Sequence, residues 1–295
     1  MRGPEIGPRV LFSINWYNSS MSFSRVGVFY NELKTHVAPL AQEAVSFLRA
    51  RGVHTVLLTA LDPLPEVDVL LSMGGDGTML RCARACAPKR VPVLGINCGT
   101  LGFLAAAEKE EMTLALQTLL DGQCTLHTRL MLRAVVRQNG TEQTFAALND
   151  CVLHASNMRA FFIDAAFNTT PMPSYFGDGV IVSTPTGSTA YSLAAGGPII
   201  APQVNAWVVT PVCPHSLNER PIVLPAEGTL QLKPSFKNAE DSAIVSFDGQ
   251  IHTPVGPGAE ILISRAPEAA QLFTLPQRNF FTMLHKKLNW GEQAC

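Results

Sequence analysis

A glycine-rich segment with one carboxylate, Met73-Gly74-Gly75-Asp76-Gly77-Thr78, is the part of this chain best suited to chemistry. It follows an apolar run, residues 67–72, and precedes a helix-like run, residues 79–87. Glycines let backbone N–H groups approach a ligand, and a helix N-terminus favours negative charge, so the segment suits phosphate groups. Asp76 adds a carboxylate that can accept a proton. The structural alternative is a tight turn in which Asp76 caps the helix.

A second segment, residues 177–198, runs from a Gly-Asp-Gly turn through an apolar strand into a loop rich in Ser and Thr. A short helix should follow, with Ser188 or Thr189 as its cap and Gly196-Gly197-Pro198 as its end. Small side chains, hydroxyl groups and backbone N–H groups suit a pyrophosphate or a ribose. The alternative is a close-packed turn between two domains.

A third segment, Leu148-Asn149-Asp150, places an amide beside a carboxylate at the end of a predicted strand. The pair could hydrogen-bond an adenine edge and a ribose diol. Asn-Asp pairs are also common in turns, which is the structural alternative.

Composition limits the classes of function. The 295 residues carry a net charge of −1, which gives no case for binding nucleic acid or a charged membrane surface. The seven cysteines are scattered without a CxxC pair, so reduced thiols in a cytoplasm fit better than a zinc site or disulfides. No apolar run approaches the roughly 20 residues that a membrane-spanning helix needs. The histidines lack the spacing of metal ligands.

The elements before residue 123 alternate between strand and helix. Strands are predicted at 26–30, 53–59, 67–73 and 91–96, and helices near 36–51, at 78–87 and at 109–121. Such alternation predicts a parallel sheet, with ligands at the carboxyl ends of its strands. Asp76 and the stretch Asn97-Cys98-Gly99-Thr100-Leu101-Gly102-Phe103 follow two such ends, so they could face one cleft.

The pattern changes after residue 123. Strands are predicted at 130–136 and 145–153 around the Asn139-Gly140 turn, and at 161–167, 179–183, 206–212, 229–232 and 243–247. The domain organisation that we expect is a flexible extension at 1–24, a Rossmann-like parallel α/β domain at 25–122 and 275–295, and a mainly antiparallel, β-rich nucleotide-binding domain at 123–274. A C-terminal helix at 279–288 should return to the first domain.

Four motifs taken together closely resemble those of the NAD kinase family, in the family's order. They are GGDGT at 74–78, NCGTLGF at 97–103, LND at 148–150 and DGVIVSTPTGSTAYSLAAGGP at 178–198. GGDGT alone also resembles loops of lipid kinases and phosphofructokinases, whereas the long fourth motif is specific. The resemblance spans about residues 25–288.

The resemblance implies an ATP-dependent NAD kinase. Asp76 would take the proton from the 2′-hydroxyl of the adenosine ribose of NAD, and that oxygen would attack the γ-phosphoryl of ATP to give NADP. Gly74, Gly75 and Thr78 would lie at phosphates, with Mg²⁺ or another divalent cation carried mainly by ATP. The NAD site would comprise Gly77, Arg81, Asn149, Asp150, Asp178, Thr189, Ala190, Tyr191, Ser192, Leu193, Ala194 and Gln250.

The resemblance also implies a homodimer or homotetramer formed through the β-rich half. Asp150 stands where the family often has Glu, and Ala194 where it often has Ser. Two other functions remain open: a lipid or sugar kinase with the same loop, against which the fourth motif argues, and a nucleotide-binding regulator without turnover, against which the intact Asp76 argues. Polyphosphate is an alternative donor to ATP, and NADH an alternative acceptor to NAD.

Overall fold

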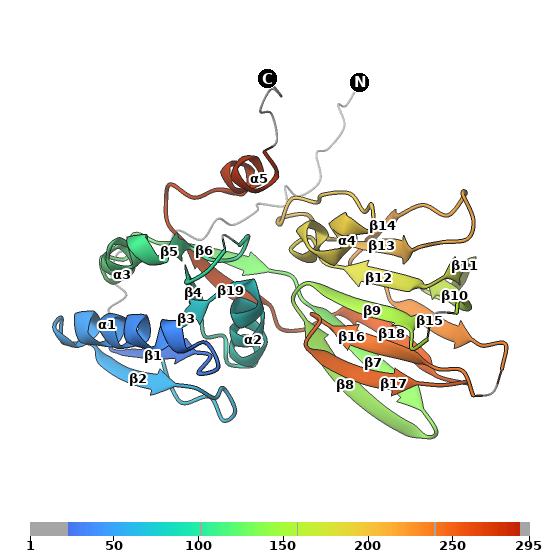
Figure 1. Ribbon diagram of the computed structural model, residues 1–295, viewed down its shortest axis with the longest axis horizontal. Coiled ribbons are helices and arrows are strands. Elements are labelled where there is room, and N and C mark those ends of the chain that lie inside the picture. Colours follow the sequence, from blue (N-terminus) through green and yellow to red (C-terminus); the bar gives the residue numbers. More distant parts are fainter. Residues whose placement is uncertain (1–22, 101, 158, 239, 290–295) are drawn as a thin grey trace, which may run out of the picture.

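The computed structural model describes residues 23–289 except 101, 158 and 239. The extension predicted at 1–24 therefore lies almost wholly outside the described residues. The remaining chain forms a mixed α/β part and a β-rich part, as predicted, and Figure 1 shows them side by side. No helix of the described residues is both long enough and apolar enough to cross a membrane.

The α/β part is built on a sheet with the strand order β2-β1-β3-β4-β19-β6, in which β5 also pairs with β4. All pairs are parallel except β19 with β6. The strands are β1 Arg25–Tyr30, β2 His54–Leu58, β3 Val69–Gly74, β4 Val93–Asn97, β5 Ala107–Glu108, β6 Thr125–Arg129 and β19 Ala270–Thr274.

Helices cover both faces of this sheet. The helix α1 (Ala38–Arg49), preceded by the 3₁₀ turn η1 (Thr35–Val37), shares a buried core with α3 (Met112–Leu120), which η3 (Lys109–Glu111) precedes. The helix α2 (Asp76–Cys86), followed by η2 (Ala87–Lys89), packs in a separate core on the other face. Because helices cover both faces of the inner strands, β3 is buried along its whole length.

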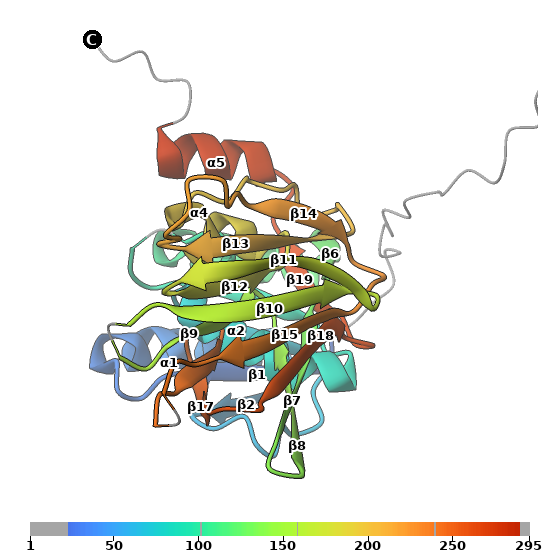
Figure 2. The same cartoon turned by 90° about the vertical axis from the view of Figure 1, so that its right-hand side faces the viewer.

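The β-rich part consists of two six-stranded antiparallel sheets that share one apolar core. Figure 2 turns this part toward the viewer. The first sheet has the order β11-β10-β15-β18-β7-β8, with β7 Leu132–Gln138, β8 Thr141–Ala147, β10 Phe161–Phe167, β11 Thr170–Gly177, β15 Leu230–Ser235 and β18 Glu260–Arg265. The second has the order β14-β13-β12-β9-β16-β17, with β9 Asp150–Ala155, β12 Gly179–Ser183, β13 Ala206–Val212, β14 Ile222–Pro225, β16 Ala243–Phe247 and β17 Ile251–Val255.

Two sequence expectations change here. The single strand predicted at 145–153 is wrong, because the chain leaves β8 at Ala147 and enters the other sheet as β9 at Asp150. The strands β6 and β19 fall within 123–274, the range expected to form the β-rich domain, yet they pair in the α/β sheet. That sheet is therefore completed by a strand from near the end of the chain.

The remaining helices are short. The turn η4 (Gly187–Thr189) and the helix α4 (Tyr191–Ala194) follow β12, and α5 (Phe280–Leu288) lies near the C-terminus. The expected return of the C-terminal helix to the α/β part is confirmed, because Lys287 of α5 lies 5.8 Å from the centre of the Phe103 ring. Arg278, just before α5, also contacts Ala105, Glu108 and Glu111.

Candidate active site

Asp76 is held by a loop of the α/β part and does not cap its own helix. It is the first residue of α2, and Gly75 occupies the N-cap position without a side-chain cap. The Asp76 carboxylate instead accepts backbone hydrogen bonds from Phe103, at 2.9 Å, and Leu104, at 3.1 Å. Hydrogen bonds from N–H groups to a carboxylate are among the stronger ones in proteins, so the loop fixes the direction of this side chain.

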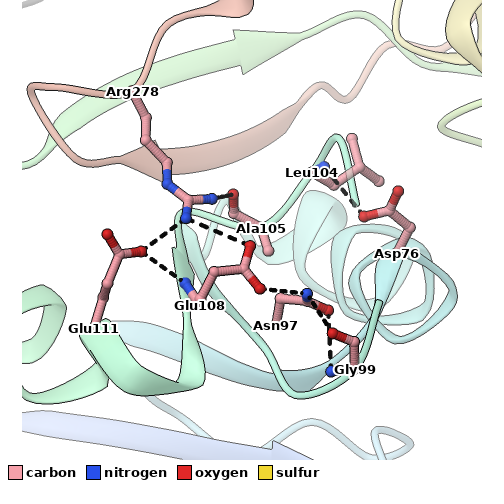
Figure 3. A network of polar contacts seen from close by, with 8 residues as sticks. All are labelled: Asp76, Asn97, Gly99, Leu104, Ala105, Glu108, Glu111 and Arg278. Atoms are coloured by element: carbon pink, nitrogen blue, oxygen red, sulfur yellow. Dashed lines mark hydrogen bonds and ion pairs between the residues drawn. The ribbon is translucent and has the colours of Figure 1, made fainter. Parts of the chain in front are cut away.

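A polar network keeps the loop in place (Figure 3). Asn97, at the end of β4, donates to Glu108 at 2.6 Å and to the Gly99 carbonyl at 3.1 Å. Arg278 donates to Glu111 at 2.7 Å and to the Ala105 carbonyl at 3.3 Å, and it lies 3.5 Å from Glu108. The loop is thus tied at one end to the Asn97 amide and at the other to the Arg278 guanidinium, which helps to orient the two N–H groups that hold Asp76.

A cavity of about 790 Å³ lies in the β-rich part, at the end of β9. Its wall includes five of the predicted site residues, namely Asn149, Asp150, Asp178, Ala190 and Tyr191. Asn149 Oδ1 is buried and has no hydrogen-bond partner among the described residues. Buried polar atoms are nearly always paired in folded proteins, so this oxygen marks a place for a donor group of a ligand.

Asp150 contributes a buried carboxyl group to the same wall. The side chain has no hydrogen-bond partner among the described residues, and the residue is only 5% exposed. Burial raises its pKa to about 7, with a further contribution from the nearby Asp248 carboxylate. A carboxyl group in this position is suited to accept hydrogen bonds from the hydroxyls of a sugar.

The pKa of Asp150 predicts a pH-dependent stability. Its folded-state pKa is raised above that of the unfolded chain, so its contribution is most favourable at acidic pH and is lost as pH rises toward about 7. An uncharged Asp150→Asn side chain avoids this loss. Without ligand, Asp150→Asn should therefore be more stable relative to the parent at pH 8 than it is at pH 5. We expect the free energy of unfolding, variant minus parent, to differ between the two pH values by on the order of 1–3 kcal/mol.

The measurement is urea unfolding of both proteins at the two pH values. Asp164→Asn, at an exposed position on β10, makes the same chemical change and should show no such difference between pH 5 and pH 8. Equal effects of Asp150→Asn at both pH values would contradict the raised pKa.

Asp248, in the turn between β16 and β17, joins the two parts of the molecule. Its carboxylate accepts backbone hydrogen bonds from Leu148 at 3.1 Å, Asn149 at 2.7 Å and Asp150 at 3.3 Å. It also forms an ion pair with Arg84 of α2, and the Asp248 side chain is completely buried. These bonds explain why the chain breaks between β8 and β9, because the N–H groups of residues 148–150 turn toward one carboxylate.

Gln250, two residues further, completes the connection to the glycine-rich segment. Arg84 donates to Gln250 Oε1 at 2.6 Å, and Gln250 Nε2 donates to the Gly77 carbonyl at 2.7 Å. We call Arg84, Asp248 and Gln250 the interdomain latch. It ties α2 to the Asn149-Asp150 pair.

Arg84→Met is expected to destabilise the protein by about 3 kcal/mol, because it leaves the buried Asp248 carboxylate without its cation. The matched control is Arg137→Met, which removes an arginine from an ion pair with Glu142 at a half-exposed position. Thermal and urea unfolding should show a large loss for the first variant and nearly none for the second. Similar losses of stability in the two variants would show that the interdomain latch contributes no more than an exposed ion pair.

A second cavity, of about 560 Å³, includes Gln250 of the Asp248-Gly249-Gln250 turn in its wall, together with residues of α2. Asp248 and Gly249 line the first cavity, whereas Gln250 and Ile251 line the second. The sequence prediction assigned Gly77, Arg81 and Gln250 to the NAD site, and these three residues line the second cavity. Its other lining residues are Asn31, Lys34, Thr78 and Arg84.

Several other predicted site residues make contacts within their own segments. A Cβ on Gly74 would lie 2.3 Å from Thr78 Oγ1, so the close approach of these residues requires glycine. Thr189 donates to the Thr186 carbonyl at 3.2 Å, and the buried Ser192 hydroxyl pairs with that of Thr210 at 2.9 Å. Thr189, Ser192, Leu193 and Ala194 are absent from the described walls of both cavities.

The capping role predicted for Ser188 or Thr189 is wrong. No side chain caps η4 or α4, whose N-cap residues are Thr186 and Ala190. The buried Ser188 hydroxyl instead donates to the Pro185 carbonyl at 2.7 Å and accepts from the Ile200 backbone N–H at 2.9 Å. It therefore fastens the hydroxyl-rich loop to the segment after α4.

Sequence reasoning missed three residues that shape the site. Asp248 and Arg84 were not singled out for the site, and neither was His154, which lines the first cavity. The only local signal was the Asp-Gly-Gln turn. It was ambiguous, because an Asp before Gly also suits a plain hairpin turn. The partner of Asp248 lies 164 residues away, a separation that no local pattern reveals.

No group of three or more His, Cys, Asp or Glu side chains is arranged to hold a metal ion within the described part of the chain. These residues therefore do not fit a site built by the protein around a metal. All six cysteines of the described residues are free thiols.

Comparison with known families gives a consistent match over both parts. Residues 59–124 match the family described as ATP-NAD kinase N-terminal domain, and residues 148–275 match the ATP-NAD kinase C-terminal domain. A protein of Treponema denticola named NAD kinase is 40% identical over 266 residues, which cover 88% of this chain and 93% of that protein. The NAD kinase of Heliobacterium modesticaldum is 36% identical over 281 residues, which cover 90% and 99%.

Solved structures share the fold. Yeast NADH kinase complexed with NADH superposes with a TM-score of 0.86 at 22% identity, covering 94% of this chain and 90% of that chain. An NAD kinase from Archaeoglobus fulgidus in complex with ATP gives a TM-score of 0.73 at 24% identity, covering 88% and 98%.

Proposed function

The chain belongs to the NAD kinase family, and on that premise we propose that Asp76 is the base in the phosphorylation of NAD to NADP. ATP is the phosphoryl donor, and the acceptor is the 2′-hydroxyl of the adenosine ribose. The observation that carries the assignment of the acceptor site is that the unpartnered Asn149 amide oxygen and the buried Asp150 carboxyl lie on the wall of one cavity.

The first cavity supplies the recognition of the acceptor. Asn149 Oδ1 accepts a hydrogen bond from the exocyclic amine of the adenine, and Asp150 accepts bonds from ribose hydroxyls. Tyr191, which is 48% exposed at the cavity wall, offers its ring to a face of the nucleotide. Asp178 and Ala190 line the same space. Thr189, Ser192, Leu193 and Ala194 complete the proposed loop as support or as contacts.

Asp76 supplies the proton transfer. A carboxylate offers about four lone-pair sites, so the two bonds from Phe103 and Leu104 leave an acceptor site for the ribose hydroxyl. The proton of the 2′-hydroxyl moves to Asp76, and the oxygen forms a bond to the γ-phosphorus of ATP. The bond between the γ-phosphorus and its bridging oxygen breaks, and the electron pair leaves with ADP.

A divalent cation is proposed to travel with the phosphates of ATP, where it would neutralise charge. Magnesium commonly binds through substrate phosphates with only one or two carboxylates, so the lack of a ligand cluster among the described residues is compatible with this role.

The test of the proposed function is formation of NADP from NAD and Mg-ATP, detected with a dehydrogenase that accepts only the 2′-phosphorylated cofactor. NADP should accumulate in step with ADP. If calorimetry showed NAD binding while saturating Mg-ATP gave no NADP, the chain would be a nucleotide-binding protein without turnover.

Self-association through the β-rich part is also proposed. Phe162 on β10 and Ile222 and Val223 on β14 are exposed apolar side chains of that part, which is consistent with a homodimer or homotetramer. Light scattering with size-exclusion chromatography measures the assembly directly. A cytoplasmic location, proposed from the free cysteines, is checked by imaging the tagged protein in cells.

A further inference from the structure

The Asn149-Asp150 pair stands where the chain passes from one sheet of the β-rich part to the other. Leu148 and Asn149 lie outside both strands, between the end of β8 and the start of β9. A backbone that leaves a sheet loses the hydrogen bonds of that sheet, so its N–H and C=O groups need other partners. The directions of the Asn149 and Asp150 side chains therefore depend on the groups that hold the peptide units of residues 148–150.

One carboxylate holds all three N–H groups of this segment. Asp248 Oδ1 accepts from Asn149 at 2.7 Å and from Asp150 at 3.3 Å. Asp248 Oδ2 accepts from Leu148 at 3.1 Å and from the Arg84 guanidinium. A carboxylate has about four acceptor sites, so these four donors use the whole capacity of the Asp248 side chain. That side chain is completely buried, and hydrogen bonds to a carboxylate are stronger than those between neutral groups.

The carbonyl groups of the same segment are held as well. Thr184, which follows β12, donates from its hydroxyl to the Leu148 carbonyl at 2.6 Å and from its N–H to the Asn149 carbonyl at 2.8 Å. The Asp248 N–H donates to the Asp150 carbonyl at 3.0 Å. Every backbone N–H and C=O of residues 148–150 is thus bonded, which fixes the orientation of the three peptide units.

The side chains that this segment presents to the first cavity are unpaired. Asn149 Oδ1 is buried without a hydrogen-bond partner, and the Asp150 carboxyl accepts no hydrogen bond from the described residues. Both residues line the first cavity. Buried polar groups are nearly always paired, so a fully bonded backbone beneath two unpaired side chains indicates a segment that holds those side chains toward a ligand.

We propose that Asp248 and Thr184 are positioning residues of the acceptor site, which fix the directions in which Asn149 and Asp150 meet the adenosine end of NAD. Both act through the backbone of residues 148–150. The proposal rests on the proposed function and adds which residues give the acceptor pair its geometry. Arg84 takes part through its ion pair with Asp248, and it does so from α2, the helix that begins at Asp76.

Asp248→Asn keeps the size of the side chain but sets an NH₂ group among N–H donors. The KM for NAD and the Kd for NAD should both rise about tenfold. The KM for ATP should stay within about twofold and kcat within about threefold, because contacts to adenine and ribose serve the ground state and the transition state alike. Steady-state kinetics and titration calorimetry with NAD measure these constants.

Asp68→Asn is the matched control. The Asp68 carboxylate also accepts hydrogen bonds from two successive backbone N–H groups, those of Ser24 at 2.7 Å and Arg25 at 2.8 Å. Asp68 directly precedes β3, at the opposite end of that strand from Asp76. Asp68→Asn should lower the melting temperature and leave the KM and Kd for NAD unchanged. Equal effects of Asp68→Asn and Asp248→Asn on NAD binding would reduce Asp248 to a structural role.

Thr184→Val tests the second positioning residue independently, including the case in which Asp248→Asn does not fold. Valine keeps the shape of the side chain and removes the hydroxyl that bonds the Leu148 carbonyl, while the bond from the Thr184 N–H remains. The KM and Kd for NAD should rise between about threefold and tenfold, with kcat little changed. The control is Thr118→Val, which removes a buried hydroxyl that donates to the Leu114 carbonyl within α3.

A pH profile separates positioning of the acceptor pair from a general loss of stability. Burial raises the pKa of Asp150 to about 7, and the Asp248 carboxylate contributes to this increase. Asp248→Asn should therefore move the rise of kcat/KM for NAD to lower pH than in the parent. Thr184→Val keeps every charge and should leave the profile in place. The other titratable residues that line the first cavity are common to all these proteins, namely His154, Asp178, Tyr191 and Cys213.

The two proposals fail in different ways. A parent protein that bound NAD but made no NADP would contradict the proposed function, and the Kd for NAD in Asp248→Asn and Thr184→Val would still test the positioning. A parent protein that did not bind NAD would contradict both. An active protein in which both substitutions leave the KM and Kd for NAD at the values of the parent would overturn the positioning role alone.

Discussion

Asp76→Asn is expected to lower kcat for NADP formation by roughly 10²–10⁴, the usual contribution of a positioned base. The KM for NAD should change by less than about threefold, because the adenine and ribose contacts lie on the other part of the molecule. The asparagine keeps one oxygen that can accept from Phe103 or Leu104, so the loop should remain close to its place. Steady-state kinetics with NAD and Mg-ATP measures both constants.

The control for this substitution is Asp121→Asn, the same chemical change at an exposed residue that ends α3. It should leave kcat and both KM values unaltered. Near-normal turnover in Asp76→Asn would remove Asp76 from the chemical step. A raised KM with an unchanged kcat would instead assign the carboxylate to substrate binding.

The second large effect concerns Gly102, a glycine of the loop that holds Asp76. A Cβ on Gly102 would lie 2.0 Å from Asp76 Oδ1 and 2.5 Å from its Cγ. Gly102→Ala should therefore force the Asp76 side chain to rotate away from the N–H groups of Phe103 and Leu104. Because the displaced group is the end of a flexible side chain, we expect kcat to fall by about 10²–10³ with a melting temperature close to that of the parent protein.

Gly99→Ala provides a matched control in the same loop. A Cβ on Gly99 meets no atom within 4 Å, so the variant should retain its activity. Equal losses in the two alanine variants would indicate that the loop needs flexibility rather than space for Asp76. Normal activity in Gly102→Ala would show that the bonds from Phe103 and Leu104 do not set the position of the base.

Local sequence patterns predicted the α/β part well because its signals are local. The buried strands β1, β3 and β4 are continuous apolar runs, and α2 begins directly after the glycines that end β3. The order of these elements implies parallel pairing, so the approximate place of Asp76 followed from the chain itself. The resemblance of residues 178–198 to the NAD kinase family supplied the identity of the acceptor.

The parts that sequence could not provide depend on distant residues. The break between β8 and β9 depends on Asp248, about 100 residues further along the chain, which holds the N–H groups of residues 148–150. The walls of the two cavities are equally non-local, since both include residues of the Asp248-Gly249-Gln250 turn between β16 and β17. The sequence predicted Ser188 as a helix cap because a serine hydroxyl can accept a hydrogen bond from a backbone N–H in either place. In the structure it accepts from the N–H of Ile200, outside the helix.

The position of β19 has a consequence for how the chain must be made. This strand, residues 270–274, lies between β4 and β6 in the α/β sheet, although β4 is complete by Asn97. A ribosome that synthesises the chain from its N-terminus therefore releases the first strands long before the strand that joins them to β6 exists. Such a topology has high contact order, which slows folding. The sheet beside which Asp76 lies can therefore be completed only after almost the entire polypeptide has been synthesised.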